Sequence, residues 1–402
     1  MSMLGNIRKY LKLGIILIIN TFTRLVPSKT EEYYDLVIVR SDAIGDFVLW
    51  LDCIRAYRRK YINKKVLLIC PVCDKEIALK VDFFSEVITY NHKQIICNIK
   101  YYNTVKKKIV HIGSDQLIMP SRTHQFGADL ICSLINSKKK ITTAPKVEIA
   151  TYTLVDRIVS KLIDLGIVGF LKSFFTDFVT LPQNGIISDF EDNRFFTNNV
   201  IDDSYESRLT DLSFIYKDYS PLINDSYCLI SLSSSNILKN WPNERVSEII
   251  KIIPPVYTVV LSGYGDDDML KAQYLIKNNI RNHKLINTVN KTSITDLICL
   301  ISKASFVLGN DSAAIHIAAA CHVPSICYTH GAHFGRYVPY PKTLPEKQYH
   351  PHCVFVKMDC YGCGYRCNKE FNPNQPFYCL RQVSVEMVKN ELEILLHDIK
   401  YS

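Results

Sequence analysis

The sequence lacks a strong excess of either charge. Lysine and arginine number 48 against 39 acidic residues, which leaves a net charge of +9. An excess of this size is compatible with an anionic lipid surface or a phosphorylated substrate, and it is too weak to indicate a nucleic-acid partner. With 48% hydrophobic and 22% charged residues, the chain has the composition of a soluble globular protein and not of a disordered one. Its 402 residues suffice for two domains, each with its own core.

The first 27 residues lack acidic side chains and a convincing small-residue cleavage site, so a secretory signal is not expected. The uncharged run from Leu13 to Thr23 is too short to span a bilayer. Apolar side chains recur at helical spacing among four basic ones: Leu4, Ile7, Leu11, Ile15, Ile18, Phe22 and Leu25, with Arg8, Lys9, Lys12 and Arg24. We predict a basic amphipathic helix over residues 1–30 that lies on an anionic membrane surface. A helix docked on its own domain is the alternative.

The 14 cysteines fall into two groups. Most are scattered singly through apolar runs, which indicates buried thiols in a reducing compartment and hence a cytoplasmic protein. Four others form a CxxC-x3-C-x11-C array in a Gly/Pro/Asn-rich loop at 353–379: Cys360, Cys363, Cys367 and Cys379. Such an array could hold a structural zinc ion, because CxxC is a usual pair of zinc ligands. Reduced surface thiols or disulfides are the alternatives.

The first α/β domain is predicted over residues 31–220. The run DLVIVR reads as a buried parallel strand, and the loop SDAIGD and a helix from Phe47 to Tyr61 follow. Strands at 64–70, 86–90 and 109–113 continue the alternation, with a helix at 74–84, a basic loop at 106–108 and a polar excursion at 188–206. Asp46 lies at the mouth of the first helix. Its carboxylate could act as a general base above the strand end, or it could only stabilise the helix start.

The second α/β domain is predicted over 221–385, with a C-terminal helix at 384–402. Its first strand, YCLIS, ends in a serine-rich loop that holds Ser234, Ser235 and Lys239. Two hydroxyls and one ammonium group make a plausible phosphate clamp, although a solvated loop would have the same composition. Trp241-Pro242 then announces a helix, and a later strand ends at Gly263.

The stretch from Phe306 to Gly331 predicts a strand, a turn, a helix rich in small residues and a second strand. Asp311 or Ser312 can cap the helix, whose free N–H groups carry partial positive charge and suit a phosphate. Ala313 and Ala314 would let a ligand approach the backbone. His316 falls one turn later on the same face. The alternative is an ordinary crossover in which the alanines only pack and His316 is a satisfied core histidine.

Four motifs in this order resemble glycosyltransferase family 9, the lipopolysaccharide heptosyltransferases and their relatives. They are RSDAIGD at 40–46, SSSNILKNWP at 233–242, LSGYGDDD at 261–268 and GNDSAAIHIAAACHVPSICYTHG at 309–331. The resemblance implies an α/β GT-B fold, in which two Rossmann-like domains face a central cleft. It places the acceptor on the N-terminal side and the nucleotide-sugar on the C-terminal side.

Residue roles follow from the same resemblance. Asp46 would be the general base of an inverting, metal-independent transfer that needs no cofactor, and Ser41 and Gly45 would lie in the acceptor-side loop. Ser234, Ser235, Lys239 and Gly263 would contact the donor, as would the helix start formed by Asp311, Ser312, Ala313, Ala314 and His316. The chain departs from the family where Ala313 replaces a usual glycine, and where His333 and Arg336 follow Gly331. Both departures bear on the identity of the sugar.

The sequence therefore predicts an enzyme that moves heptose or a related sugar from a nucleotide-sugar, such as ADP-heptose, to lipopolysaccharide or another surface glycan. The acceptor would be lipid-linked, and the enzyme would be peripheral on the cytoplasmic face of a bacterial inner membrane. A different GT-B enzyme, such as a nucleotide-sugar epimerase, is one alternative. A non-catalytic relative that binds sugar nucleotides is another.

Overall fold

The computed structural model describes residues 3–25, 28–144, 174–182, 187–220, 222–232, 234, 236–279 and 284–401. The chain divides into two units. The first comprises Met1–Phe47, Cys53–Gln183 and Asp192–Glu206, and the second comprises Val48–Asp52, Asn184–Glu191 and Ser207–Ser402.

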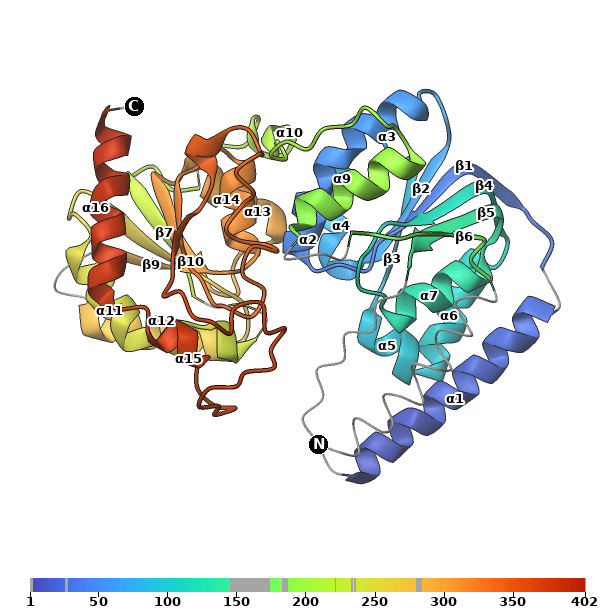
Figure 1. Cartoon of the computed structure of the whole chain (residues 1–402), viewed down its shortest axis with the longest axis horizontal. Helices are drawn as coiled ribbons and strands as arrows, with labels where there is room; N and C mark the ends of the chain where they lie inside the picture. The colour runs from blue at the N-terminus through green and yellow to red at the C-terminus, as the bar shows by residue number, and fades with distance from the viewer. Residues whose placement is uncertain are drawn as a thin grey trace. The chain divides into compact units, whose positions relative to one another are not determined.

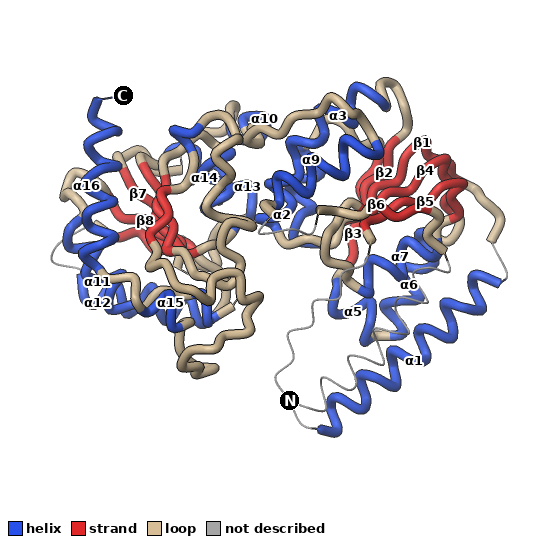
Figure 2. Tube along the Cα trace, viewed as in Figure 1, coloured by secondary structure: helices blue, strands red, loops and turns tan. Residues whose placement is uncertain are grey.

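The first unit is built on a parallel six-stranded sheet with the order β3-β2-β1-β4-β5-β6 (Figures 1 and 2). Its strands are β1 (Glu32–Val39), β2 (Val66–Pro71), β3 (Glu86–Tyr90), β4 (Ile112–Met119), β5 (Asn136–Thr143) and β6 (Asp177–Val179). The helices along this part of the chain are α1 (Met3–Leu25), α2 (Ile44–Trp50), α3 (Ile54–Lys60), α4 (Lys75–Lys80), α5 (His92–Cys97), α6 (Ile99–Ile109), α7 (Phe126–Leu134) and α9 (Asp189–Val200). The central strands are buried because they are continuous apolar runs, as expected for a parallel sheet covered on both faces.

The second unit repeats this plan with the order β12-β11-β10-β7-β8-β9, again all parallel. Its strands are β7 (Tyr227–Ser231), β8 (Thr258–Ser262), β9 (Leu285–Asn287), β10 (Phe306–Asn310), β11 (Ser325–Tyr328) and β12 (His352–Val354). Its helices are α10 (Ser213–Tyr216), α11 (Asn243–Ile252), α12 (Asp266–Asn279), α13 (Ile294–Lys303), α14 (Ala313–Ala320), α15 (Tyr378–Arg381) and α16 (Val385–Tyr401). The strand order 3-2-1-4-5-6 in each unit is that of a Rossmann-like fold.

Three local predictions between residues 47 and 206 are wrong. Lys106–Lys108 do not form a loop but the last turn of α6, where their positive charge complements the helix dipole, and β4 begins later, at Ile112. The predicted excursion at 188–206 contains α9, which opens with reciprocal hydrogen bonds between Ser188 and Glu191. The long helix expected from Phe47 to Tyr61 is interrupted by a 3-10 turn at Leu51–Cys53.

Helix α1 packs on its own unit. Ile16 and Asn20 are fully buried, and the Asn20 amide donates to the Tyr102 hydroxyl on α6 at 3.2 Å and to the Ser133 hydroxyl on α7 at 3.0 Å. Figure 1 shows α1 running beside α5, α6 and α7. The opposite face of α1 is apolar and exposed. No helix in the described ranges combines the length and apolar character needed to cross a bilayer.

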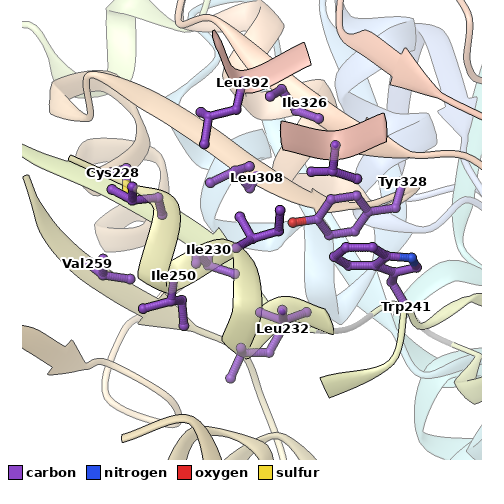
Figure 3. Packing of buried hydrophobic residues seen from close by; sticks show 14 of the residues in the cluster. Cys228, Ile230, Leu232, Trp241, Ile250, Val259, Leu308, Ile326, Tyr328 and Leu392 are labelled. Atoms are coloured by element: carbon purple, nitrogen blue, oxygen red, sulfur yellow. The ribbon is translucent and has the colours of Figure 1, made fainter. Parts of the chain in front are cut away.

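The core of the second unit joins its sheet to the loop that follows β7 (Figure 3). Trp241 is 2% exposed, and its ring lies against Tyr328 on β11 with centroids 4.4 Å apart. Its indole N–H donates to the carbonyl of Val383 at 3.0 Å, and its backbone N–H donates to the Asn310 side chain at the end of β10 at 2.7 Å. A buried aromatic group with its polar atoms satisfied fixes its surroundings strongly. Residues 236–241 are therefore held at the carboxyl ends of β7 and β10.

Candidate functional site

The buried carboxylate of Asp311 lies close to three basic side chains at the carboxyl ends of β7, β10 and β11. Asp311 follows β10, and its Oδ2 lies 3.8 Å from Lys239 Nζ and 3.2 Å from His330 Nε2. Its Oδ1 lies 4.0 Å from His316 Nε2 on α14. Ligands of open parallel sheets bind at this edge. The sequence prediction named Asp311, Lys239 and His316, and the structure brings these three together; it did not single out His330.

The charge state of this cluster follows from its contacts. Burial acts to raise the pKa of the Asp311 carboxyl, but Lys239, His330 and His316 hold that pKa well below its usual range. Burial lowers the pKa of His316 to about 4, and it also lowers the pKa of His330 despite the opposing charge of Asp311. At neutral pH the cluster thus holds one carboxylate, one ammonium and two neutral imidazoles.

Hydrogen bonds orient both imidazoles. The backbone N–H of Ala332 donates to His330 Nδ1 at 3.1 Å, so in the neutral ring the proton is on Nε2 and faces Asp311. His316 Nδ1 lies 2.9 Å from the Tyr340 hydroxyl, and the two rings are stacked. His316 is therefore buried and hydrogen-bonded, as expected of a core histidine. It also lies near the Asp311 carboxylate, as expected of a residue at the ligand site.

The start of α14 differs from the sequence prediction. Ser312 is the N-cap residue, but its side chain makes no capping hydrogen bond, and its Oγ is buried without a partner. Asp311 faces Lys239 and His330 instead of capping the helix. The first turn contains Ala313 and Ala314, whose small side chains occupy little space beside the helix N-terminus. A helix start with an uncommitted hydroxyl is well suited to an anionic group.

The loop before Lys239 is fastened by its own side chains. The Ser234 backbone N–H donates to the Asn240 side chain at 2.8 Å, and the Ser234 hydroxyl donates to the carbonyl of Asn236 at 3.0 Å. The Asn236 side chain caps the 3-10 turn Ile237–Lys239. Ser235 lies outside the described residues. Ser234 thus shapes the loop that carries Lys239, a role that residue type alone did not reveal.

Gly263 directly follows β8, at a position that has no room for a side chain. A Cβ atom there would lie 2.4 Å from Oδ2 of Asp268, which accepts the backbone N–H of Tyr264 at 3.0 Å. The glycine therefore permits the tight turn into α12.

The loop after Gly331 carries His333 and Arg336, two of the three residues that the sequence analysis named as departures from the family. Arg336 pairs with Asp189 at 3.3 Å, and the His333 ring lies against Tyr365 with centroids 4.5 Å apart. Both side chains are thus engaged in holding the loop.

The loop that is predicted to lie on the acceptor side follows β1 in the first unit. The Ser41 hydroxyl donates to Ser121 at 3.3 Å, Gly45 is buried, and Asp46 is half-buried in the first turn of α2. Beneath them Arg40 pairs with Asp42 and donates to the carbonyl of Pro120 at 2.7 Å. Sequence reasoning missed this buried arginine, although it stands directly at the strand end.

A second buried carboxyl lies near this loop. Burial first, and then the charge of Asp42, raise the pKa of Asp74 to about 8. Asp74 is therefore largely protonated at neutral pH, which adds no further negative charge around Asp46.

All 14 thiols of the chain are free. Among the described residues, no group of three or more His, Cys, Asp or Glu side chains is arranged so that it could already hold a metal ion.

Comparison with known proteins finds both a family model and individual proteins that are similar to this chain. Residues 161–340 match the family model described as glycosyltransferase family 9 (heptosyltransferase). Lipopolysaccharide heptosyltransferase 3 of Escherichia coli is 30% identical over 105 residues, which is 26% of this chain and 31% of that protein. The chain thus spans about a third of the length of the curated relatives that it matches.

Solved structures agree over a much larger part of the chain. An E. coli heptosyltransferase bound to ADP-2-deoxy-2-fluoro heptose has a TM-score of 0.61 at 14% identity, covering 89% of this chain and 99% of that one. A glycosyltransferase family 9 protein from Veillonella parvula DSM 2008 has a TM-score of 0.62 at 14% identity, covering 92% and 100%. These likenesses confirm the predicted α/β GT-B fold.

The buried state of His316 predicts a pH dependence of stability. Its pKa is about 4 when folded and 6.5 as an ordinary histidine, so between these values the unfolded chain binds a proton that the folded chain does not. The free energy of unfolding is therefore complete above pH 6.5 and falls as pH drops toward 4, by about 3 kcal/mol from this residue. We expect His316→Gln to flatten the curve of melting temperature against pH in this window.

His397→Gln is the matched control, because His397 is exposed on α16. It should reproduce the wild-type curve. A His316→Gln protein with the wild-type slope between pH 4 and 6.5 would show that the His316 environment is wrongly described.

Proposed function

We propose that the chain is a member of glycosyltransferase family 9 and that it transfers a sugar from a nucleotide-sugar to a hydroxyl group of a lipid-linked surface glycan. The observation that carries this proposal is the cluster of Lys239, Asp311 and His330 beside the N-terminus of α14. The names of the matched relatives support heptose, or a related sugar, as the group transferred.

The donor diphosphate would bind between Lys239 and the start of α14. Lys239 is largely buried and lies 3.8 Å from Asp311, which is beyond direct hydrogen-bond distance, so the carboxylate holds the ammonium in place while an entering phosphate can still approach it. The backbone N–H groups of the first turn and the Ser312 hydroxyl would contribute further donors. The Asp311 carboxylate would in turn accept hydrogen bonds from hydroxyl groups of the nucleotide-sugar.

The proposed chemistry is a single displacement with inversion. Asp46 removes the proton from the acceptor hydroxyl, the hydroxyl oxygen forms a bond to the anomeric carbon, and the bond from that carbon to the diphosphate breaks. The nucleoside diphosphate leaves with its electron pair. Lys239 and the α14 N-terminus stabilise the charge that develops on it, so that this chain's own groups supply the electrostatic assistance. In this scheme no metal takes part.

The donor would be an ADP-linked sugar. The solved relative with the same fold was crystallised with an ADP-linked heptose analogue, which supports this choice. Ala313 places a methyl group where the family usually has glycine, so it would restrict how closely the donor can approach the helix start.

We further propose that α1 places the enzyme on an anionic membrane surface. Four apolar side chains on its outer face are exposed: Ile15, Ile18, Phe22 and Leu25. The adjacent helices α5 and α6 expose basic side chains: Lys93, Lys100, Lys107 and Lys108. An exposed apolar stripe beside basic groups is typical of a helix that lies at a lipid interface. The enzyme would then work at the cytoplasmic face of the inner membrane, where a lipid-linked acceptor is available.

We predict that Asp46→Asn abolishes sugar transfer and leaves donor binding unchanged, because asparagine keeps the shape of the side chain and cannot accept the proton. Transfer to lipopolysaccharide core acceptors should fall by at least about 10²-fold, the lower end of the contribution of a general base. Donor affinity is measured in parallel by titration calorimetry. Asp82→Asn, an exposed carboxylate in the same unit, should leave both quantities as in the wild type. Transfer by Asp46→Asn at a rate near that of the wild type would refute the base assignment.

We predict that replacing Ile18 and Phe22 together by serine weakens binding to phosphatidylglycerol vesicles by at least about tenfold, which corresponds to about 1.4 kcal/mol of lost apolar burial. Both side chains are more than half exposed, at 59% and 66%, so the fold should tolerate the change. The measurement is co-sedimentation with anionic vesicles and with neutral phosphatidylcholine vesicles.

The control for this variant replaces Ile62 and Val256, which are comparably exposed and lie outside α1. It should bind vesicles as the wild type does. Equal vesicle binding by the α1 variant and the wild type would rule out this surface as the membrane contact.

A further inference from the structure

One long segment of the second unit has neither helix nor strand. It spans residues 355–377, between β12 and α15, and its residues 368–375 are mostly exposed. The apolar side chains that anchor it form a small cluster: Leu238, Phe377 and Cys379, with Met358, Tyr361 and Tyr365 packed against them. Irregular segments of this length are uncommon in compact domains unless they are functional, and those without a core of their own usually depend on a covalent or metal cross-link.

Four thiols from this segment and α15 line a single small cavity. Cys360 and Cys363 come from one turn, Cys367 from the next, and Cys379 from α15. The same cavity is bordered by Gly331 and by Lys369. The four cysteines, whose spacing in the sequence resembles a set of metal ligands, thus also lie around one cavity. The sequence alone could not establish this.

A backbone N–H group is directed at one of these sulfur atoms. The Gly331 N–H donates to Cys379 Sγ at 3.3 Å. Gly362, Gly364 and Tyr365 have positive φ angles, which allow the tight turn that carries Cys363. Amide hydrogen bonds to sulfur are a recurring feature around metal-bound cysteines.

The backbone of the cysteine turn is fixed before any metal arrives. The Gly362 N–H donates to the carbonyl of Gly331 at 2.8 Å, and the Gly364 N–H donates to the carbonyl of Ala332 at 2.9 Å. Although the side chains as they stand do not yet form a ligand set, each cysteine has one side-chain torsion with three staggered positions. Rotation about that torsion can turn a sulfur atom into the cavity while the backbone stays in place.

We propose that Cys360, Cys363, Cys367 and Cys379 bind one zinc or iron ion through four thiolates. Binding releases the four thiol protons and forms four metal–sulfur bonds, which gives a divalent complex a net charge of −2. Lys369, at the edge of the cavity, partly offsets this charge. Four-sulfur tetrahedral coordination is typical of zinc and iron among the metals of proteins.

The metal site would stabilise the positions of Lys239 and His330 in the donor-binding cluster. The Phe377 N–H donates to the carbonyl of Leu238 at 2.8 Å, and Leu238 immediately precedes Lys239. The rings of Phe377 and Tyr365 each lie 6.0 Å, centroid to centroid, from the ring of His330, which contacts Asp311. A metal that cross-links this segment would therefore restrain both Lys239 and His330. This consequence rests on the proposed donor site, whereas the metal site itself does not.

The test measures bound metal in the full-length protein. Wild type is purified without chelator, under reducing conditions, from cells grown with added zinc and iron, and its metal content is determined by mass spectrometry. We expect one metal ion per chain, four additional titratable thiols after treatment with a strong chelator, and at least tenfold weaker ADP binding in the metal-free protein. Cys363→Ser should lose the metal. Cys97→Ser, a half-buried cysteine on α5, should keep it.

Metal-free wild type titrated with Co²⁺ keeps the test informative if the Cys363 variant does not fold. Absorption bands of tetrahedral cobalt–thiolate coordination are expected at one equivalent. Wild type without zinc, iron or such bands would overturn the proposal, and so would a loss of free thiols to disulfides in the native protein. Metal with unchanged ADP affinity after its removal would refute only the link to the donor site. None of these measurements depends on sugar transfer, so failure of the metal proposal leaves the proposed function standing.

Discussion

The interaction on which the second unit depends is the contact of a buried carboxylate with buried basic groups. Asp311 is 5% exposed, and removing a charge from water to this extent costs several kcal/mol unless partners compensate it. Lys239 and His330 provide that compensation from two other strand ends. The pKa of Asp311 is consequently held low although burial alone would raise it. Loss of Lys239 would leave the Asp311 carboxylate buried without a counter-charge, so the loop that carries Lys239 and the end of β10 are constrained together.

The packing around this cluster holds the three strand ends at fixed positions relative to one another. Trp241 lies on Tyr328 of β11 and hydrogen-bonds to Asn310 of β10, so one residue connects the loop of Lys239 to both neighbouring strands. Asn236 and Asn240 close that loop internally. Without these contacts, the Lys239 ammonium group would be free to move toward another carboxylate or into water. The rigid loop instead presents the ammonium group at a fixed place, as preorganised stabilisation of charge requires.

Much of the fold could be predicted from the sequence because parallel strands are continuous apolar runs with clear ends. The strand at Phe306, the helix rich in alanine and the strand at Ser325 were all predicted, and the structure confirms them as β10, α14 and β11. The predictions were wrong where a run of charged residues was interpreted as a loop although the segment forms a helix. Lys106–Lys108 suggested a loop, yet three lysines are favourable in the last turn of a helix. The Ser188–Glu191 capping pair was a readable signal for α9 that the acidic composition obscured.

The site was only partly predictable for a different reason. Residue types indicated Lys239 and Asp311, but the contact of Asp311 with His330 depends on which strands are neighbours in the sheet, and spacing along the chain does not show this. Likewise residue type gave Ser234 only a predicted role in phosphate binding, and it did not show that the Ser234 hydroxyl also closes the loop itself. Arg40 was missed because an arginine at a strand end is usually read as a solvent-exposed terminus, while here it is buried against Asp42.

The central claim is that Lys239, held by Asp311 beside the α14 N-terminus, binds a nucleoside diphosphate without help from a dissolved metal ion. The most direct measurement is titration calorimetry of ADP into the protein purified as it exists in cells, in buffer free of magnesium, for wild type, Lys239→Gln and the exposed-lysine control Lys251→Gln on α11. The account predicts binding by wild type and by the control, and at least about tenfold weaker binding by Lys239→Gln. Equal affinity in all three proteins, or binding by wild type only when magnesium is added, would contradict it.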